Sequence, residues 1–263
     1  MSTMLKLTNI TKTFNPGTVT EKKALRGIDL ELEDGDFVTI IGGNGAGKST
    51  LLNLIAGVHY TDTGSVELDG MDLTGKPEFV RAKYLGRVFQ DPMMGTAANM
   101  EIEENLAMAM RRGKNRGLGW HIKNEERDLY REKLALLDLG LEKRMNAKVG
   151  LLSGGQRQAL TLLMATLQKP KLLLLDEHTA ALDPKTAKKV LELTEEFVAQ
   201  DNLTTFMVTH NMKDAIRYGN RLIMMMDGQI VFDVRGEEKK NLTVEDLLAK
   251  FSISGVVSDK MLG

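Results

Sequence analysis

Residues 42–50 carry the chemistry that this sequence shows most directly. They read Gly-Gly-Asn-Gly-Ala-Gly-Lys-Ser-Thr and fit the phosphate-binding pattern G-x-x-x-x-G-K-[ST]. The glycines let backbone N–H groups turn toward an anion. Lys48 is placed to reach the β- and γ-phosphates of a nucleotide, and the Ser49 hydroxyl can ligate Mg²⁺. The alternative is a glycine turn followed by a chance Lys-Ser pair, so the flanking segments have to decide.

The flanking segments predict a strand before these residues and a helix after them. Residues 37–41 are β-branched or aromatic and predict a buried strand, whereas residues 51–56 predict a helix that Gly57 ends. The helix N-terminus adds the positive end of its dipole. We therefore expect a nucleotide phosphate to be bound by the whole loop, that is by Gly42, Gly43, Asn44, Gly45, Ala46, Gly47, Lys48, Ser49 and Thr50.

A second group of candidate residues ends another predicted strand. Residues 172–175 are all leucine, and Asp176 and Glu177 follow them. Parallel strands present ligands at their carboxyl ends, where the phosphate loop also lies. Asp176 can hold Mg²⁺ through water, and Glu177 is placed to polarise the water that attacks a γ-phosphate. Taken alone, the pair would suit a strand that ends in a polar turn equally well.

Composition narrows the class of protein. A chain of 263 residues fits one large α/β domain or two small ones. Its net charge of −1 gives no support for a nucleic-acid binder, which usually shows a basic excess. There is no cysteine, so disulfides and thiolate chemistry are excluded. We see no signal peptide and no apolar run of about 18 residues, and we expect a soluble chain that can still dock on a membrane protein.

The order of the predicted elements indicates an α/β fold. Residues 4–33 alternate as antiparallel strands do, and short strands are expected at 65–69 and 84–89. Strands then alternate with helices, which predicts a parallel sheet. We expect the strands at 172–175, 203–208 and 222–226, and the helices at 185–199, 211–218 and 244–251.

A helical pattern interrupts this order between about residues 98 and 168. Within it, the segment 124–138 places Leu129, Lys133, Leu136 and Leu137 near one face. We therefore predict a P-loop NTPase core with a mixed parallel sheet, an N-terminal antiparallel β subdomain and an inserted α-helical subdomain. In terms of boundaries, one domain covers 1–252 with its helical subdomain at about 95–168, and 253–263 form a tail.

The segment 152–156, Leu-Ser-Gly-Gly-Gln, opens the helical pattern 157–167. Ser153 is a natural N-cap there, and the paired glycines permit close approach to an anion. Read alone, the segment is a helix cap. Because it follows the phosphate loop and precedes the two carboxylates, it resembles the signature of the ATP-binding-cassette (ABC) family.

Further residues carry the same resemblance, which covers about residues 4–235. Gln90 is similar to the family's Q-loop glutamine, His210 to its switch histidine, and residues 181–183 to its D-loop. The resemblance implies that Gln90 joins Ser49 and Asp176 around Mg²⁺, and that Lys48, Glu177 and His210 act in catalysis. It also implies that Phe14 stacks on adenine, with a plain core phenylalanine as the alternative.

The family resemblance further implies a composite site in a dimer. Two copies of the subunit would sandwich two ATP molecules head to tail, each between one copy's phosphate loop and Ser153, Gly154, Gly155 and Gln156 of the other.

Two departures from the family pattern are His178, where proline is usual, and Ala180, where serine is usual. Neither removes a metal ligand or a base. His178 could alter the local turn or titrate near neutrality, which leaves the D-loop geometry open.

The functional prediction is an ATP-hydrolysing subunit of a membrane transporter. It would use ATP and Mg²⁺ to import a small solute, with amino acids as a candidate class, through a separate permease served by a solute-binding protein. It would lie on the cytoplasmic face of the membrane and bind no nucleic acid. The alternatives are a soluble cassette acting on ribosomes or nucleic acid, which normally has two cassettes, and a DNA-repair cassette split around a long coiled coil.

Docking on the permease is expected through residues of about 83–110. Met93 and Met94 form an apolar pair in a segment expected to be a loop, beside Gln90, and such exposed groups mark docking surfaces. The alternative is that both methionines pack inside. The basic stretch 111–117 is interpreted as a solvated loop rather than a lipid or partner contact. Residues 224–226, three methionines in a strand pattern, are expected in the core.

Overall fold

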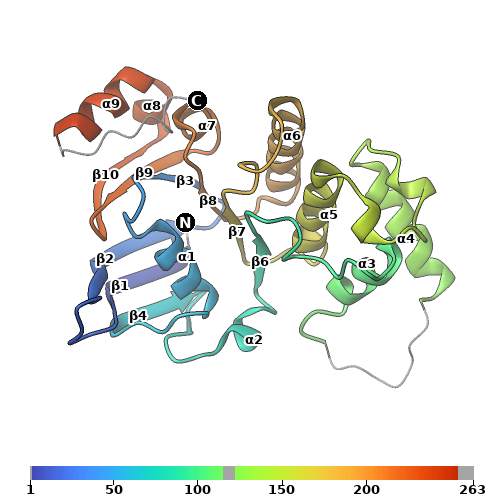
Figure 1. Ribbon diagram of the computed structural model, residues 1–263, viewed down its shortest axis with the longest axis horizontal. Helices are drawn as coiled ribbons and strands as arrows, with labels where there is room; N and C mark the ends of the chain where they lie inside the picture. The colour runs from blue at the N-terminus through green and yellow to red at the C-terminus, as the bar shows by residue number, and fades with distance from the viewer. Residues whose placement is uncertain (1, 115–121, 254–263) are drawn as a thin grey trace. The chain divides into compact units, whose positions relative to one another are not determined.

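The structure is a computed structural model that describes residues 2–114 and 122–253. The chain divides into two compact units, and each is described here by itself (Figure 1). Unit 1 consists of residues 1–81 and 202–263, and unit 2 of residues 82–201. Unit 1 therefore takes both ends of the chain, and unit 2 is inserted into it.

The first sheet of unit 1 is antiparallel and has the strand order β2-β1-β4-β5. It is built from β1 (Thr3–Phe14), β2 (Lys22–Glu33), β4 (Thr63–Leu68) and β5 (Met71–Asp72). Leu5, Leu7 and Ile10 of β1 are buried, with exposed residues between Leu7 and Ile10. The antiparallel strands predicted for residues 4–33 are confirmed.

The second sheet of unit 1 is mixed. β3 (Phe37–Ile41) lies between β8 (Thr205–Val208) and β9 (Arg221–Met226) and is parallel to both. β10 (Gln229–Arg235) pairs antiparallel with β9 and was not predicted. Every residue of β3 is buried, which is why its sequence is uniformly apolar apart from Thr39. Met224 and Met225 lie in the core, as expected.

Helices complete unit 1. α1 (Lys48–Ala56) follows β3, α2 (Glu78–Arg81) follows the antiparallel sheet, and α7 (Met212–Arg217) follows β8. α8 (Gly236–Lys240) and α9 (Val244–Ile253) end the described chain. Leu247 and Phe251 of α9 pack in one apolar cluster with Met212 of α7 and Met224 of β9. The predicted helix at 244–251 is therefore confirmed, and its apolar face anchors the C-terminal end of unit 1.

Unit 2 combines two strands with helices. β6 (Leu85–Val88) and β7 (Leu172–Asp176) pair in parallel. α5 (Gly154–Thr166) contacts β6 and three further helices. These are α3 (Ile102–Met110), α4 (Asn124–Ala135) and α6 (Pro184–Asp201). Two short 3₁₀ turns, Leu141–Lys143 and Val149–Leu151, connect α4 to α5.

The buried face of α4 differs from the prediction. Tyr130 and Leu134 are fully buried, whereas Leu136 is 46% exposed. The reason is that the buried face is formed by positions 130, 134 and 137, which are spaced i, i+4 and i+7, and Leu136 lies off this face. Leu137, one residue further, is buried as expected. An aromatic residue five positions before the helix end, Tyr130, therefore supplies part of the contact that the leucines were expected to make.

The predicted domain boundaries stay a prediction. α3, α4 and α5 lie inside the range 95–168 that was expected to be helical. Of the expected tail, residues 254–263 lie outside the described residues. No helix in the described part of the chain combines the length and the apolar character that crossing a membrane requires.

Candidate nucleotide-binding and hydrolysis site

The phosphate loop lies in unit 1 between β3 and α1, as the sequence predicted. Gly47 caps the N-terminus of α1 with φ of 102°, a left-handed conformation that favours glycine. A Cβ atom at Gly47 would also lie 2.7 Å from the carbonyl oxygen of Ala24. At the other end, the Gly57 N–H bonds to the carbonyls of Asn53 and Leu54 and ends the helix. The predicted helix end at Gly57 is therefore confirmed, whereas the helix begins at Lys48, three residues before the predicted start.

The loop encloses the Lys48 ammonium group. Lys48 is only 5% exposed, and its Nζ donates hydrogen bonds to the carbonyl oxygens of Gly42 at 2.7 Å and Gly43 at 3.2 Å. Asn44 and Gly45, at the tip of the loop, are exposed, and so is Ser49 on the first turn of α1. A buried cation at a helix N-terminus, inside a loop open to solvent at its tip, is suited to bind an anion.

Phe14 and His210 also lie in unit 1. Phe14 ends β1, is half-buried, and meets the ring of His59 edge-on with the centroids 5.2 Å apart. His210 follows β8 and is half-buried. The residue after it, Asn211, caps α7 by accepting from the N–H groups of Lys213 and Asp214, so the backbone beside His210 is anchored.

The two carboxylates lie in unit 2, at the end of β7. Asp176 is the last residue of the strand, and Glu177 has a left-handed φ of 46°. Arg87 of β6, which the sequence analysis did not single out, places Nη2 3.9 Å from Asp176 Oδ2. The guanidinium group of Arg87 also lies over the Phe89 ring, 4.4 Å from its centroid. Arg87 was missed because its relation to Asp176 depends on the parallel pairing of two strands that are distant in sequence.

His178 is buried, not a surface residue of the turn. It is 2% exposed, and its Nε2 lies 3.1 Å from the Thr194 hydroxyl of α6. Burial lowers the pKa of His178 to about 4, because the charged imidazolium would lose its hydration. The expectation that His178 could titrate near neutrality is therefore wrong, and the ring is neutral at pH 7.

The signature segment, residues 153–156, forms the N-terminus of α5 in unit 2. The Ser153 hydroxyl accepts from the Gln156 N–H at 3.3 Å, and the Gln156 side chain accepts from the Ser153 N–H at 3.2 Å. This reciprocal pair is a capping box, so the predicted N-cap is confirmed. Gly155 has no room for a side chain, because a Cβ atom would overlap Thr186 Cγ2, whereas at Gly154 the nearest atom is 3.6 Å away.

A buried arginine holds the segment that leads into this cap. Arg157 is 7% exposed and donates through Nη2 to the carbonyl oxygens of Val149 and Gly150. The sequence analysis did not single out Arg157 either, since a basic residue in the first turn of a helix usually faces solvent.

The predicted site residues are thus divided between the units. Unit 1 holds the phosphate loop, Phe14 and His210, and unit 2 holds Gln90, Asp176, Glu177 and residues 153–156. Gln90 is exposed and follows β6, and the preceding Phe89 carbonyl accepts from Gln158 Nε2 at 3.0 Å. The expected magnesium ligands, Ser49, Gln90 and Asp176, all offer oxygen atoms, which is the donor type that Mg²⁺ prefers. Among the described residues, no group of three His, Asp or Glu side chains forms a separate metal site.

Known proteins are similar to this chain in sequence and in fold. A family model described as ABC transporter matches residues 25–180. The tyrosine transport ATP-binding protein of Clostridioides difficile is 47% identical over 253 residues, which cover 94% of this chain and 98% of that protein. The chain belongs to the ABC transporter family. The spermidine/putrescine import ATP-binding protein of Aliivibrio fischeri is 33% identical over 95% of this chain and 64% of its own.

One solved structure of a similar cassette contains the products of ATP hydrolysis. The dimeric post-hydrolysis structure of an ATP-binding cassette bound to ADP and Pi has a TM-score of 0.74 and 31% identity, over 88% of this chain and 98% of its own. The predicted P-loop fold, the family and the ATPase activity are therefore confirmed: this ABC chain is an ATP-binding subunit of a transporter. The assignments of individual residues stay predictions.

Proposed function

We propose that this ABC subunit binds and hydrolyses ATP at the cytoplasmic face of a membrane to energise import of a small solute through a separate permease. The observation that carries the proposal is the phosphate loop closed around Lys48 in a chain of this family. The names of two relatives, one in tyrosine transport and one in spermidine/putrescine import, favour import of a small nitrogen-containing solute. An amino acid delivered by a solute-binding protein fits them best.

The proposed chemistry assigns one task to each predicted residue. Residues 42–50 bind the phosphates, Lys48 neutralises the γ-phosphate, and Phe14 stacks on adenine. Ser49, Gln90 and Asp176 would hold Mg²⁺, which when bound neutralises charge on the phosphate oxygens. Glu177 orients the attacking water and accepts its proton, and His210 assists the chemical step.

The proposed active form is a head-to-tail dimer. A helix N-terminus with two glycines is a suitable second phosphate clamp, and α5 offers one at residues 153–156. The dimeric relative bound to ADP and Pi supports this arrangement. Each ATP would then lie between the phosphate loop of one copy and the signature segment of its partner.

Replacing Glu177 tests the chemical assignment. We expect Glu177→Gln to lower hydrolysis by about 10²- to 10⁴-fold, because an amide cannot accept the proton, while ATP binding is kept. Size-exclusion chromatography with ATP should then show an accumulated dimer. Glu195→Gln, an exposed carboxylate on α6 of the same unit, is the matched control. A Glu177→Gln subunit that hydrolyses ATP at the normal rate would assign the water to another residue.

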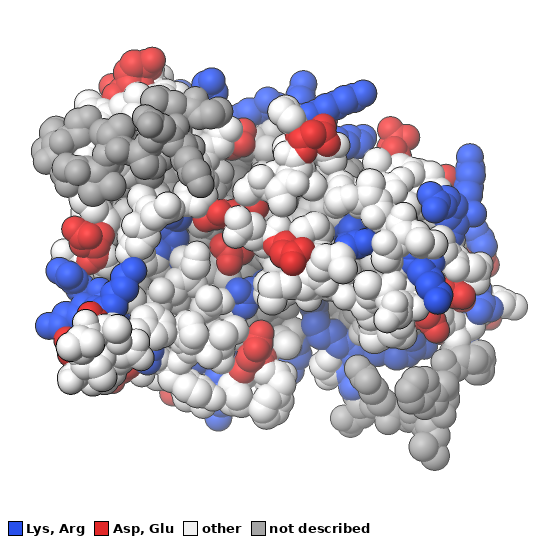
Figure 2. Space-filling view, viewed as in Figure 1, with Lys and Arg blue, Asp and Glu red and all other residues white. Residues whose placement is uncertain are grey.

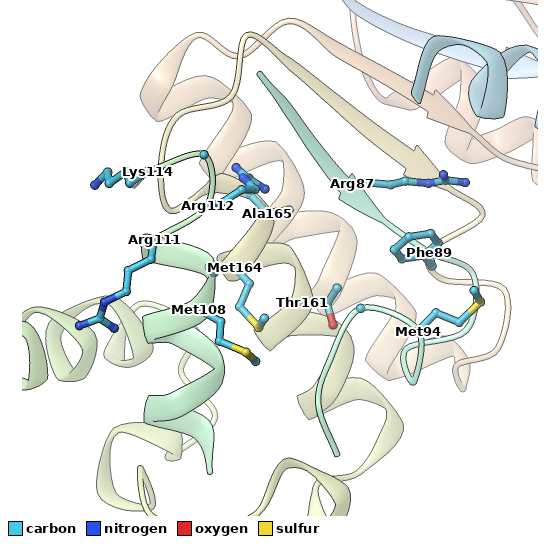
Figure 3. Close-up of a pocket in the computed structure, with 13 residues that line it drawn as sticks. Arg87, Phe89, Met94, Met108, Arg111, Arg112, Lys114, Thr161, Met164 and Ala165 are labelled. Carbon is cyan, nitrogen blue, oxygen red and sulfur yellow. The ribbon is translucent and has the colours of Figure 1, made fainter. Parts of the chain in front are cut away.

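A groove in unit 2 supports docking of the permease (Figure 3). It has a volume of about 460 Å³ and lies between the segment after β6, the C-terminal end of α3 and α5. Three methionines, Met94, Met108 and Met164, line it. Met94 is 68% exposed and its neighbour Met93 is 49% exposed, so the alternative that both methionines pack inside is wrong. Exposed flexible apolar side chains suit the apolar face of a partner helix.

Basic residues line the rim of the groove: Arg111 and Arg112 are half-buried, whereas Lys114 is exposed, as expected for a solvated loop. Arg111 bonds both oxygens of Glu126, at 2.9 and 3.0 Å. Arg112 donates from Nη2 to the Ala165 carbonyl, and burial lowers its pKa. No ion pair among the described residues includes Arg112, and its buried Nε has no hydrogen-bond partner there. We therefore propose that the docking helix brings a carboxylate to Arg112. Residues 115–117 of the basic stretch lie outside the described residues.

Cysteine crosslinking in membranes tests the docking. The chain has no native cysteine, so Met94→Cys provides a single reactive site. We expect Met94→Cys to crosslink to an integral membrane protein, Arg112→Glu to reduce that product, and the exposed control Lys240→Cys in unit 1 to give none. Crosslinks only to soluble proteins, or only from Lys240→Cys, would overturn the proposed docking surface.

The alternative of a nucleic-acid or ribosome partner has little support on the one face that Figure 2 shows. On the face shown in Figure 2, the described Lys and Arg side chains are interspersed with Asp and Glu side chains. A binder of nucleic acid instead gathers its positive charge on one face or along one groove.

A further inference from the structure

The turn between β7 and α6 holds Glu177 in an unusual backbone conformation. Glu177 has φ of 46°, and its carbonyl oxygen accepts from the Ala180 N–H at 2.9 Å. A side-chain-bearing residue in the left-handed region is strained and persists only where its surroundings hold it. Something beyond the strand must therefore hold this turn in place, and the next residue along the chain, His178, is the buried one.

The hydrogen bond between His178 and Thr194 joins this turn to the middle of α6. Thr194 is 1% exposed, and its hydroxyl donates to the Val190 carbonyl at 2.8 Å. Because that hydrogen is already committed, Thr194 Oγ1 acts as acceptor toward His178, 3.1 Å away. The neutral imidazole therefore carries its proton on Nε2 and donates it to Thr194.

We propose that His178 is a positioning residue for ATP hydrolysis: its bond to Thr194 fixes the β7–α6 turn and so aims the Glu177 carboxylate. This inference rests on the proposed role of Glu177 as the base. The usual proline of the family would stiffen the turn through its ring but has no side chain that can reach α6 with a hydrogen bond. His178 provides the same restraint by a polar contact that depends on Thr194.

The consequence is a specific kinetic signature. The phosphate loop lies in unit 1, and the capping box of residues 153–156 does not involve His178 or Thr194. Breaking the His178–Thr194 bond should therefore leave ATP binding intact and loosen only the group that acts on water. Misplacement of a catalytic group by about 1 Å can lower a rate by up to about 10²-fold.

Two matched pairs of variants test the inference. Thr194→Val removes the acceptor at nearly constant volume, whereas Thr194→Ser keeps it. His178→Leu removes the donor, whereas His178→Gln carries an amide N–H at a similar reach. We expect Thr194→Val and His178→Leu to lower kcat about tenfold with the KM for ATP unchanged. Thr194→Ser and His178→Gln should recover most of the rate.

Two further measurements distinguish the ways in which the inference could be wrong. They are the thermal unfolding temperature Tm of each variant and the turnover of the Glu177→Gln subunit. Thr194→Val and His178→Leu subunits that fold and turn over at the normal rate, beside an inactive Glu177→Gln subunit, would overturn the inference alone. Normal turnover by Glu177→Gln itself would overturn the proposed base and the inference together. If kcat and Tm fall in proportion to each other in all four variants, the hydrogen bond between His178 and Thr194 serves only the stability of the fold. If His178→Leu fails to fold, the Thr194 pair decides.

Discussion

The phosphate loop of unit 1 and the carboxylate turn of unit 2 are built in opposite ways. Both follow a buried parallel strand, β3 in one case and β7 in the other. The loop is held by backbone: glycine conformations and the carbonyls that accept from Lys48. The turn is held by side chains, through His178 with Thr194 and Arg87 with Asp176. A site made of backbone restricts its own residue types, whereas a site made of side chains depends on distant partners.

The largest expected effect comes from removing the Lys48 side chain, which the phosphate loop encloses. Lys48→Ala removes the cation that the loop encloses, so we expect ATP turnover to fall by about 10³-fold and ATP binding to weaken. Radioactive ATP hydrolysis and nucleotide titration measure both. Lys76→Ala, an exposed lysine of the same unit, is the control. Activity like that of the wild type, with contaminating ATPases excluded, would remove the assignment of the loop.

A mixing experiment tests whether the phosphate loop of one copy of the chain and residues 153–156 of another copy form one ATP site. Lys48→Ala and Ser153→Arg subunits should each be inactive alone. In a mixed dimer one site carries both defects and the other carries neither. Since half the dimers are mixed and each has one intact site, about a quarter of the activity should return.

The mixing result needs a second readout, because two sites that must act together would give no recovery. Nucleotide-dependent dimerisation, followed by size-exclusion chromatography, supplies it: Ser153→Arg should weaken the dimer, because a bulky cation replaces the capping hydroxyl. A Ser153→Arg subunit that dimerises and hydrolyses ATP normally would contradict the composite site.

Replacing His210, the side chain that unit 1 is proposed to contribute to the chemical step, should have a smaller effect. We expect His210→Ala to lower kcat by about 10²-fold while ATP affinity is kept. Because Asn211 caps α7 independently of the His210 side chain, the variant should fold normally, which thermal unfolding checks. An unchanged kcat would make His210 only structural and leave the chemical step to unit 2.

The smallest effect concerns the two glycines of the signature segment. Gly155→Ala should lower the free energy of unfolding by about 2 kcal/mol, because the new methyl group collides with Thr186. Gly154→Ala should not lower stability, since its nearest neighbour is 3.6 Å away and alanine is the better helix former. If Gly154→Ala nevertheless slows ATP hydrolysis, Gly154 serves approach to phosphate and Gly155 serves packing. Equal stability of both variants would contradict this division.

Local patterns in the sequence were sufficient for the backbone-built parts. The strand at 37–41, the helix end at Gly57 and the cap at Ser153 were predicted and are confirmed, because each depends on residues within a few positions. The strands and helices that alternate after residue 172 were found for the same reason. β10 was missed, because its three consecutive apolar residues at 230–232 break the strict alternation of a half-buried strand and are too few to predict a buried one.

Tertiary structure alone decided the side-chain partnerships. The hydrogen-bond partner of His178 is a hydroxyl 16 residues away, and the position of Arg87 depends on the pairing of β6 with β7. Arg112 became a half-buried cation at a groove only because α5 supplies the carbonyl of Ala165. The sequence determined the family, the fold class and the phosphate loop, because these follow from local backbone requirements. The surroundings of Glu177 and the chemistry of the groove were decided by packing between segments that the sequence does not place together.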